Sequence, residues 1–570
     1  MCNLVVSKPI FVIMEGIKTH LKRVILLVAA VAVISTMALA KNQKAQIARN
    51  LDIFNSLYKE LQVFYVDSID AEKSITTAIN AMLNDIDPYT VYIPAKDQAD
   101  FKTMTTGEYG GIGSYIMERD GGVYVSEPYE NSPAHKSGLK AGDLFLTIDA
   151  DTVKGWSSSQ VSERLRGQAG TDLTVTVKRP FVKDSIVKVD IVREKIQMPA
   201  VPYYGVTQGN VGYISLSTFT AGSAKEVKKA LEELKKDTRV KSIALDLRGN
   251  GGGLLEEAVK IVGLFVPKNT EVLRTKGKGH LSEKVYKTTS SPVDSKIPLA
   301  VLIDGGSASS SEIVAGALQD LDRAVIVGTR SYGKGLVQST RQLPYDGLLK
   351  VTIAKYYIPS GRLIQAIDYS HRNPDGSVAR TPDSLTTVFK TQHGREVRDG
   401  GGITPDSVVT YPDVNRLTYN IVRDHWAFDY ATRYAASTTT IVAADEFVIT
   451  DSIFADFKKF IDPQKFEYDK VCEVMLEKLR EQAETEGYMN DSIKAQFDVL
   501  QKMLKHDLNK DLDNSRAEIE SILADEILGR YYYQRGQVIG NLRYDNGIKA
   551  AAAILQDEAL YRKMLSPSKK

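Results

Sequence analysis

The chain has 570 residues, of which 43% are hydrophobic, so it can form several packed domains rather than a single core. Its 73 basic and 71 acidic side chains nearly cancel, which removes the electrostatic reason to expect nucleic acid as a partner. Only Cys2 and Cys472 are present, so a disulfide framework is excluded. Stability must therefore come from packing.

The first 40 residues have the character of an export signal. A basic stretch ending at Arg23 precedes an apolar run (24–40) that ends in Ala38-Leu39-Ala40, the small-residue pattern of a signal-peptidase site. The run is short for a spanning helix of about 20 residues, so we favour a cleaved signal (1–40) over a membrane anchor. Met14 opens a more ordinary signal than the first methionine does. We expect an exported protein of the periplasm or cell envelope, with an inner-membrane anchor as the alternative.

Residues 41–105 are predicted to form an N-terminal helical arm. Apolar residues recur there at three- and four-residue intervals, which is the period of one helix face: Leu51, Phe54, Leu57, Leu61 and Phe64. From 106 to 196 the pattern changes to short apolar alternations separated by Gly, Asp and Asn turns, which predicts a small β-rich domain. Gly122–Ser126 and Leu144–Asp149 are two of its expected strands.

Strands and helices alternate in the region 197–413. Ser242–Leu247 and Leu299–Ile303 have strand character, and Leu254–Phe265 between them has apolar residues at helical spacing. This alternation predicts an α/β sheet with crossover helices. Residues 414–570 have amphipathic helical spacing and almost no strand signal, so we expect a helical extension that serves packing or homo-oligomer contacts. The fold class is therefore multidomain α+β.

Two glycine-rich passages stand out in the β-rich domain. Asn131–Asp149 resembles the PDZ signature, a helix-turn-strand passage with glycines that permit tight turns. Upstream, Gly110-Gly111-Ile112-Gly113 resembles the PDZ carboxylate loop, whose backbone N–H groups hold a peptide C-terminus while the peptide adds a strand to the sheet edge. Alone, this loop would be interpreted as a hairpin turn. Together the passages indicate a PDZ-like module that binds free C-termini, or one that serves only as a docking surface.

Ser309 and Lys334 lie on either side of a predicted helix. The run Ser309-Ser310-Ser311-Glu312 fits a capping box, which is a purely structural role for the serine. The same place at a helix N-terminus suits a nucleophile, because unpaired N–H groups and partial positive charge stabilise an oxyanion. No histidine lies between His280 and His371, so the local candidate for a base is a buried, neutral Lys334.

Lys334 has two other interpretations. One is a solvated lysine at a strand end. The other is a phosphate-binding loop, since Gly328-x-x-x-x-Gly333-Lys334 nearly matches that motif. Gly335 replaces the Ser or Thr that would ligate magnesium, and the loop runs into a strand-like segment where a phosphate loop would open a helix. We therefore expect no nucleotide, and since no cluster has metal-ligand spacing, we predict no cofactor and no metal.

Three further segments together resemble the carboxyl-terminal processing peptidases, also called tail-specific proteases: 306–320, 327–338 and 356–365. Asp246–Leu254 is similar to that family's glycine-rich strand exit, and the likeness runs from about residue 45 to Asp413. The resemblance implies an exported serine endopeptidase with an α/β core of the crotonase/ClpP-like type. It also implies protein or peptide substrates with free, apolar C-termini that the PDZ-like module selects.

Carried over by position, the resemblance makes Ser309 the nucleophile, Lys334 the general base and Gln338 the residue that orients the lysine. Ser310 stands where the family often has Ala, and Gly251 where it often has Pro. Neither departure removes a reactive group.

The chemistry of a serine-lysine pair sets further expectations. A free lysine has a pKa of about 10.4, so it can accept a proton near neutrality only if burial lowers that pKa. The apolar neighbours Val327, Leu336 and Val337 would supply the desolvation. As oxyanion donors we predict the backbone N–H groups of Gly252 and Ser310, since glycine lets the chain approach a substrate carbonyl closely.

Three charged residues nearby are assigned structural roles. Asp246 and Arg248, at the end of a predicted buried strand, are expected to form an ion pair, and Glu312 is expected to be a helix cap. The alternative to an enzyme is a catalytically inactive PDZ scaffold or adaptor of the cell envelope. The intact set of Ser309, Lys334 and Gln338 counts against it.

Overall fold

The computed structural model describes residues 44–570 except 208, 280–282, 370, 374–375, 412–413 and 568–570. The predicted export signal thus lies outside the described residues. The chain forms two compact units, Met1–Asp85 and Ile86–Lys570. Within the described residues, no helix combines the length and apolar character that crossing a membrane requires.

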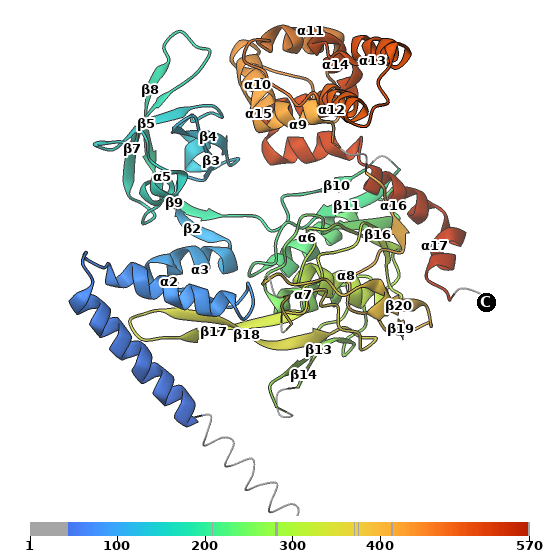
Figure 1. Ribbon diagram of the computed structural model, residues 1–570. Coiled ribbons are helices and arrows are strands. Elements are labelled where there is room, and N and C mark those ends of the chain that lie inside the picture. The colour runs from blue at the N-terminus through green and yellow to red at the C-terminus, as the bar shows by residue number, and fades with distance from the viewer. Residues whose placement is uncertain are drawn as a thin grey trace, which may run out of the picture. The chain divides into compact units, whose positions relative to one another are not determined.

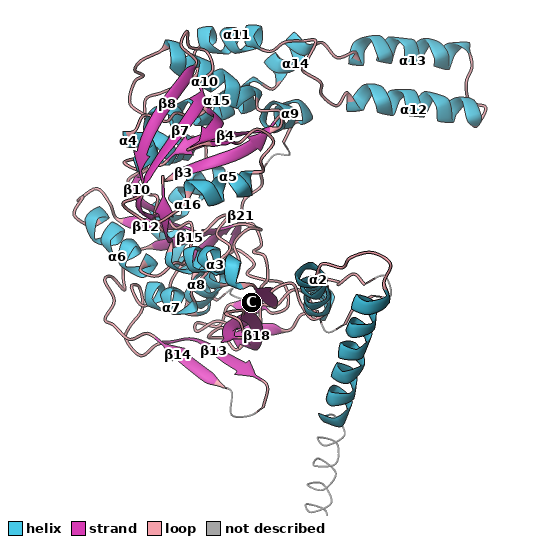
Figure 2. Ribbon diagram, turned by 90° about the vertical axis from the view of Figure 1, so that its left-hand side faces the viewer, coloured by secondary structure: helices cyan, strands magenta, loops and turns pink. Residues whose placement is uncertain are grey.

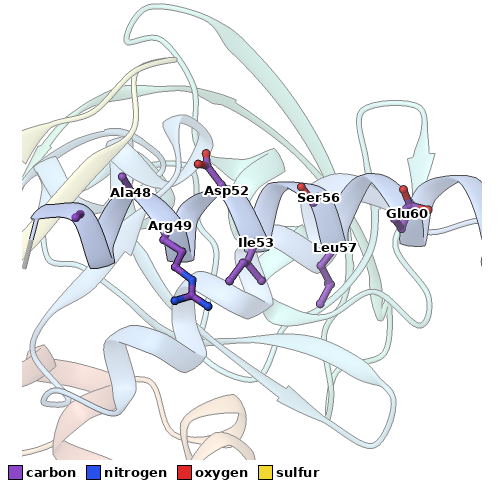
Figure 3. Close-up of a pocket in the computed structure, with 8 residues that line it drawn as sticks. Ala48, Arg49, Asp52, Ile53, Ser56, Leu57 and Glu60 are labelled. Atoms are coloured by element: carbon purple, nitrogen blue, oxygen red, sulfur yellow. The ribbon is translucent and has the colours of Figure 1, made fainter.

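The first unit is helical in its described part, in agreement with the sequence prediction. It contains a helix over 44–64 and α2 (Ala71–Asn84), which begins where the Asp70 carboxylate accepts from the Lys73 N–H at 3.0 Å. The Tyr58 hydroxyl is 2.8 Å from Ser74 Oγ and links the two helices. An open hollow of about 780 Å³ runs along the 44–64 helix. The side chains of Arg49, Ile53 and Leu57 project from the same side of this helix (Figure 3).

The second unit begins with a strand that the helical prediction missed. β1 (Val91–Ile93) pairs antiparallel with β18 (Leu348–Tyr357), and it is followed by a 3-10 turn (Ala95–Asp97) and α3 (Gln98–Thr106). The strand is too short to produce a periodic signal of its own, and its partner lies far away in the sequence. The predicted arm at 41–105 is therefore divided between the two units.

The β-rich domain is present as predicted (Figure 1). One sheet has the strand order β3-β4-β5-β7-β8, with β6 paired to β5. The strands are β3 (Ser114–Arg119), β4 (Gly122–Pro128), β5 (Leu144–Ile148), β6 (Asp151–Thr152), β7 (Asp172–Lys178) and β8 (Ile186–Val192). Two helices, α4 (Pro133–Lys136) and α5 (Ser158–Leu165), belong to this domain. β2 (Glu108–Gly111) pairs with β9 (Glu194–Gln197), so the entry and exit of the domain lie side by side.

The α/β region is built on a six-stranded sheet in the order β10-β11-β12-β15-β16-β21. All neighbouring pairs are parallel except β10-β11. The strands are β10 (Tyr203–Val206), β11 (Val211–Ser215), β12 (Ser242–Asp246), β15 (Leu299–Ile303), β16 (Val325–Gly328) and β21 (Ser407–Val408). The crossover helices α6 (Ser223–Leu234), α7 (Leu255–Val262) and α8 (Ser310–Asp320) bury their apolar residues with one face of this sheet. The predicted alternation of strands and helices is confirmed.

A second sheet carries β18 and lies next to the crossover layer (Figure 1). Its order is β1-β18-β13-β14, with β17 also paired to β18. The remaining strands of this sheet are β13 (Glu271–Gly277), β14 (Lys284–Lys287) and β17 (Leu336–Gln342). A separate hairpin, β19 (Val388–Lys390) and β20 (Glu396–Arg398), follows a 3-10 turn (Asp383–Leu385).

The C-terminal extension is helical, as predicted, but it has two parts. One part has its own apolar cluster and contains α9 (Arg416–Arg423), α10 (Trp426–Ser437), α11 (Asp451–Phe460), α12 (Val471–Thr485), α13 (Asp491–Leu504), α14 (Leu508–Asn514) and α15 (Arg516–Leu542). α12 and α13 lie side by side and project from it as a hairpin (Figure 2). The other part, α16 (Asn546–Gln556) and α17 (Glu558–Met564), buries Ile548, Ile554 and Tyr561 against the second face of the six-stranded sheet.

Candidate active site

Ser309 lies in the tight turn between β15 and α8. Its φ of 55° and ψ of −110° place a non-glycine residue in a sparsely populated conformation, which costs about 1–3 kcal/mol and must be held by its surroundings. The Asn250 carbonyl accepts from the preceding Ala308 N–H at 3.0 Å, and Glu312 accepts from the Ser309 N–H at 2.9 Å. Because every residue of α8 is buried, the helix N-terminus that presents Ser309 is rigid.

The Glu312 carboxylate joins the backbone of Ser309 to that of Lys334. Its Oε2 accepts from the Ser309 N–H at 2.9 Å and from the Lys334 N–H at 2.8 Å. Its Oε1 accepts from the Gly333 N–H at 2.7 Å and from the Ser331 hydroxyl at 2.5 Å. The residue is fully buried, and burial raises the pKa of the carboxyl, although these four hydrogen bonds favour the ionised form.

Sequence reasoning found only the capping role of Glu312 and missed this cross-link. The capping spacing is a local signal, whereas its partners in the loop that precedes β17 are remote in sequence. The Tyr356 hydroxyl adds a second cross-link, since it donates to the Lys334 carbonyl at 2.8 Å and lies 3.2 Å from the Ser309 carbonyl.

Lys334 occupies a desolvated position in the loop between β16 and β17. Burial, together with the positive charge of the nearby Lys350, lowers the pKa of its amine to about 8. Asp87 and Glu312 act in the opposite direction but do not outweigh the burial. Nζ lies 4.2 Å from the centroid of the Tyr89 ring. The direction of the shift is the one that a lysine base requires.

Gln338 lies on β17 and points toward the neighbouring strand β18. Its Nε2 donates to Thr352 Oγ1 at 3.3 Å. Among the described residues, no hydrogen bond joins its amide to Lys334, so its predicted role in orienting the lysine stays a prediction.

The two predicted oxyanion donors lie together beside the candidate nucleophile. A Cβ atom on Gly252 would lie 2.8 Å from Ser309 Cβ and 2.9 Å from the Ser310 nitrogen, and its φ of +99° also favours glycine. The Gly252 N–H donates to Asn250 Oδ1 at 2.9 Å. The Ser310 hydroxyl donates to the Gly253 carbonyl at 2.9 Å, so this second hydroxyl is engaged elsewhere.

Asp246 and Arg248 form the predicted ion pair at the end of β12. Arg248 Nε donates to Asp246 Oδ1 at 3.0 Å, and its Nη1 donates to Asp545 Oδ1 at 2.9 Å. Asp545 also accepts from the Ile548 N–H at the start of α16. The cluster therefore attaches the C-terminal helices to the sheet, in agreement with its predicted structural role.

The predicted carboxylate loop is at the edge of the β-rich domain. Gly110 and Gly111 end β2, and Ile112 and Gly113 lead into β3, which is the edge strand of its sheet and contacts α5. A Cβ atom on Gly113 would lie 2.5 Å from Ser132 Cβ, so this turn requires glycine. An edge strand beside a helix is the geometry that peptide strand addition uses.

The described residues contain no group of three or more His, Cys, Asp or Glu side chains arranged to hold a metal ion. Cys472 is exposed and free, and Cys2 lies outside the described residues.

Three known sequence families match successive parts of the chain. "PDZ domain" matches residues 110–192, and "Peptidase family S41" matches residues 210–378, which include Ser309, Lys334 and Gln338. "Probable PDZ-protease, C-terminal helical domain" matches residues 417–555. The last match covers most of the extension that the sequence analysis predicted only to be helical.

Several curated proteins are similar to this chain. The "Carboxy-terminal-processing protease" of Bartonella bacilliformis is 35% identical over 355 residues, which are 61% of this chain and 81% of that protein. A "Probable CtpA-like serine protease" of Staphylococcus aureus is 33% identical over 317 residues, 55% of this chain and 62% of that protein. The protein of the same description from Staphylococcus haemolyticus is 30% identical over 415 residues, 71% of this chain and 80% of that protein.

Proposed function

This chain belongs to peptidase family S41 and is a serine-type C-terminal processing peptidase with a PDZ domain, and we propose that Ser309 is its nucleophile and Lys334 its general base. The observation that supports this assignment most is the double cross-link between the two residues. Glu312 and Tyr356 each bind both backbone segments, so the backbones of Ser309 and Lys334 are held close together. Among the described residues, no hydrogen bond joins Ser309 Oγ to Lys334 Nζ, so the proton transfer between them is part of the proposal.

The proposed reaction is acyl transfer. Lys334 Nζ takes the proton from Ser309 Oγ as the oxygen attacks the peptide carbonyl, and then returns it to the leaving amine. With a pKa of about 8, about a tenth of the amine is neutral at pH 7, which is enough for a working base. A water molecule then hydrolyses the acyl-enzyme, with the lysine again as base.

The oxyanion of the tetrahedral intermediate would accept from the backbone N–H groups of Ser310 and Gly252. The Gly252 N–H must then be shared with, or released by, Asn250 Oδ1, which accepts it in the structure. The proposed role of Gln338 is to orient the lysine from β17. Its neutral amide adds no negative charge that would raise the pKa of the base.

Substrate selection is assigned to the PDZ domain. We propose that Gly110, Gly111, Ile112 and Gly113 hold the free C-terminus of a protein or peptide, preferably an apolar one, while its last residues pair with β3. Residues 1–40 would export the protein or attach it to a membrane. The helical extension would provide homo-oligomer contacts, and the core would be of the crotonase/ClpP-like type.

The catalytic assignment is tested with the chain that lacks residues 1–40, an unfolded protein such as casein, and a peptide with an apolar tail. Ser309→Ala and Lys334→Ala should each reduce turnover to background. Ser310→Ala is the matched control and should retain most activity, because that hydroxyl is bonded to the Gly253 carbonyl. Turnover that survives both Ser309→Ala and Lys334→Ala would refute the dyad.

For the PDZ domain, the test compares binding of a peptide with a free C-terminus and of the same peptide as its amide. Equal affinity for the two would refute carboxylate capture.

A further inference from the structure

Tyr89 forms an aromatic wall beside the amine of Lys334. It lies just before β1, and the antiparallel pairing of Val91 with Lys350 fixes it next to β18. Nζ of Lys334 lies 4.2 Å from its ring centroid, within the range of a cation–π contact. Among the described residues, this amine makes no hydrogen bond. Its contact with the face of the Tyr89 ring can therefore help to fix its position.

The position of the Tyr89 ring is fixed from both ends. At the backbone, Asp87 Oδ1 accepts from the Tyr89 N–H at 2.8 Å and from the Thr90 N–H at 2.7 Å, which closes a tight turn. At the other end, the Tyr89 hydroxyl lies 3.2 Å from the Tyr369 hydroxyl and 3.4 Å from that of Tyr332. Burial raises the pKa of the Tyr89 hydroxyl, so the ring stays neutral over the working range.

The same turn also reaches the strand that binds Gln338. Thr90 Oγ1 accepts from the Thr352 N–H at 3.2 Å, and Thr352 Oγ1 accepts from Gln338 Nε2 at 3.3 Å. One short segment ahead of the PDZ domain therefore contacts the proposed base and, through Thr352, the residue proposed to orient it.

We propose that Tyr89 is a positioning residue for the Lys334 base, with its ring face holding the amine in place and excluding water from it. The inference rests on the proposed role of Lys334. A ring attracts the charged amine and also desolvates it, and these effects oppose each other. The charged groups that face the amine are Asp87 before β1, Glu312 from α8 and Lys350 from β18. Burial is the largest cause of the lowered pKa of this amine, and the Tyr89 ring is one of the groups that cover it.

The test compares Tyr89→Phe, which keeps the ring, with Tyr89→Ala, which removes it. Tyr332→Phe is the control for loss of a hydroxyl contact alone. We expect Tyr89→Phe and Tyr332→Phe to keep kcat within about threefold and to keep the acid limb of the pH profile in place. Tyr89→Ala should lower kcat at least about tenfold with little change in KM. Its acid limb should move to higher pH as the lysine becomes hydrated.

Two outcomes would overturn the inference. One is a kcat and pH profile of Tyr89→Ala that match wild type. The other is a Tyr89→Phe enzyme as impaired as Tyr89→Ala, which would assign the effect to the hydroxyl contacts. If Tyr89→Ala does not fold, as judged by its melting temperature, Tyr89→Leu replaces it. That variant fills the space without an aromatic face, and equal kcat for Tyr89→Leu and Tyr89→Phe would also overturn the inference.

A second measurement separates this inference from the proposed function. In the Ser309→Ala chain, the pH dependence of Lys334 modification by an amine-selective reagent, mapped by mass spectrometry, reports the amine without turnover. Tyr89→Ala should move that curve to higher pH, and superimposable curves would refute the inference. If Lys334→Ala keeps wild-type turnover, the proposed function fails. If Lys334→Ala is inactive and Tyr89→Ala behaves as wild type, only the role of Tyr89 fails.

Discussion

The candidate active site and the contact between the PDZ domain and α15 both depend on a glutamate, but the two are held differently. Glu312 is fully buried and accepts four hydrogen bonds, three of them from backbone N–H groups. Glu127 on β4 is only partly buried, and its Oε1 accepts from the Gln534 N–H at 2.9 Å. The candidate active site is thus held by buried backbone contacts, whereas the Glu127 contact with α15 is only partly buried.

The surroundings of Glu127 are correspondingly loose. A hollow of about 740 Å³ separates parts of the PDZ domain from α15. The helix itself is interrupted at Tyr533, whose φ is 55°, and this break frees the next N–H to reach Glu127. Burial raises the pKa of Glu127 to about 7, and burial likewise raises that of Asp525 on α15 to about 6. Two carboxyls at this contact therefore titrate near neutrality.

The largest effect is expected from Glu312→Ala. Removing the carboxylate leaves buried donors on the Ser309 and Lys334 segments without an acceptor, so the free energy of unfolding should fall by about 3–5 kcal/mol. If the proposed dyad is correct, turnover should fall to background. Glu312→Gln is the matched control, since it keeps the shape and one accepting oxygen, and its losses should be smaller. Denaturant unfolding and kcat measure both. Wild-type kcat in a folded Glu312→Ala protein would contradict the role of the cross-link.

A smaller effect is expected from Lys350→Met. This lysine lowers the pKa of Lys334 by charge repulsion, so its removal should raise that pKa from about 8 toward the value of a free lysine. The acid limb of the rate profile should move to higher pH, and activity at pH 7 should fall about two- to fivefold. Lys355→Met, at an exposed position of the same strand, is the control and should not move the limb. An unchanged limb in Lys350→Met would argue against repulsion.

Glu127→Gln tests the looser region. We call the PDZ domain docked when Glu127 contacts α15. In that state the pKa of Glu127 is raised to about 7, so docking is favoured at low pH and weakens as pH rises from the ordinary carboxyl range through 7. Asp525, with a pKa of about 6, has the same effect on docking. At Glu127 the positive charge of Arg530 lowers the pKa, and the negative charge of Glu526 raises it. Spin labels on Cys472 and on K154C would report the docked distance. The docked fraction should fall between about pH 5 and 8, and Glu127→Gln should reduce that dependence.

The sequence predicted the elements with a strong local signal. The motif around Ser309 and Lys334 indicated the enzyme class, and the strands and helices of the core lie where alternation of apolar patterns placed them. It could not predict features that depend on remote partners. The pairing of β1 with β18 brings Tyr89 to Lys334. Helices α16 and α17 pack on the sheet through an apolar face, and the periodicity of that face does not indicate which surface it will cover.

The smallest effect is expected at an ion pair between the PDZ domain and the helical region. Arg119 Nη1 lies 2.8 Å from Asp429 Oδ1, with 18% and 34% of the two side chains exposed. A partly exposed pair contributes about 0.5–1 kcal/mol, so Asp429→Asn should change the equilibrium constant of docking by no more than about fivefold. Added salt should weaken docking of the wild type by a similar factor, because it screens the charged pair. The same salt should weaken docking of Asp429→Asn less. An undocked PDZ domain in Asp429→Asn at every pH would mean that this ion pair, rather than the carboxyls at α15, determines its position.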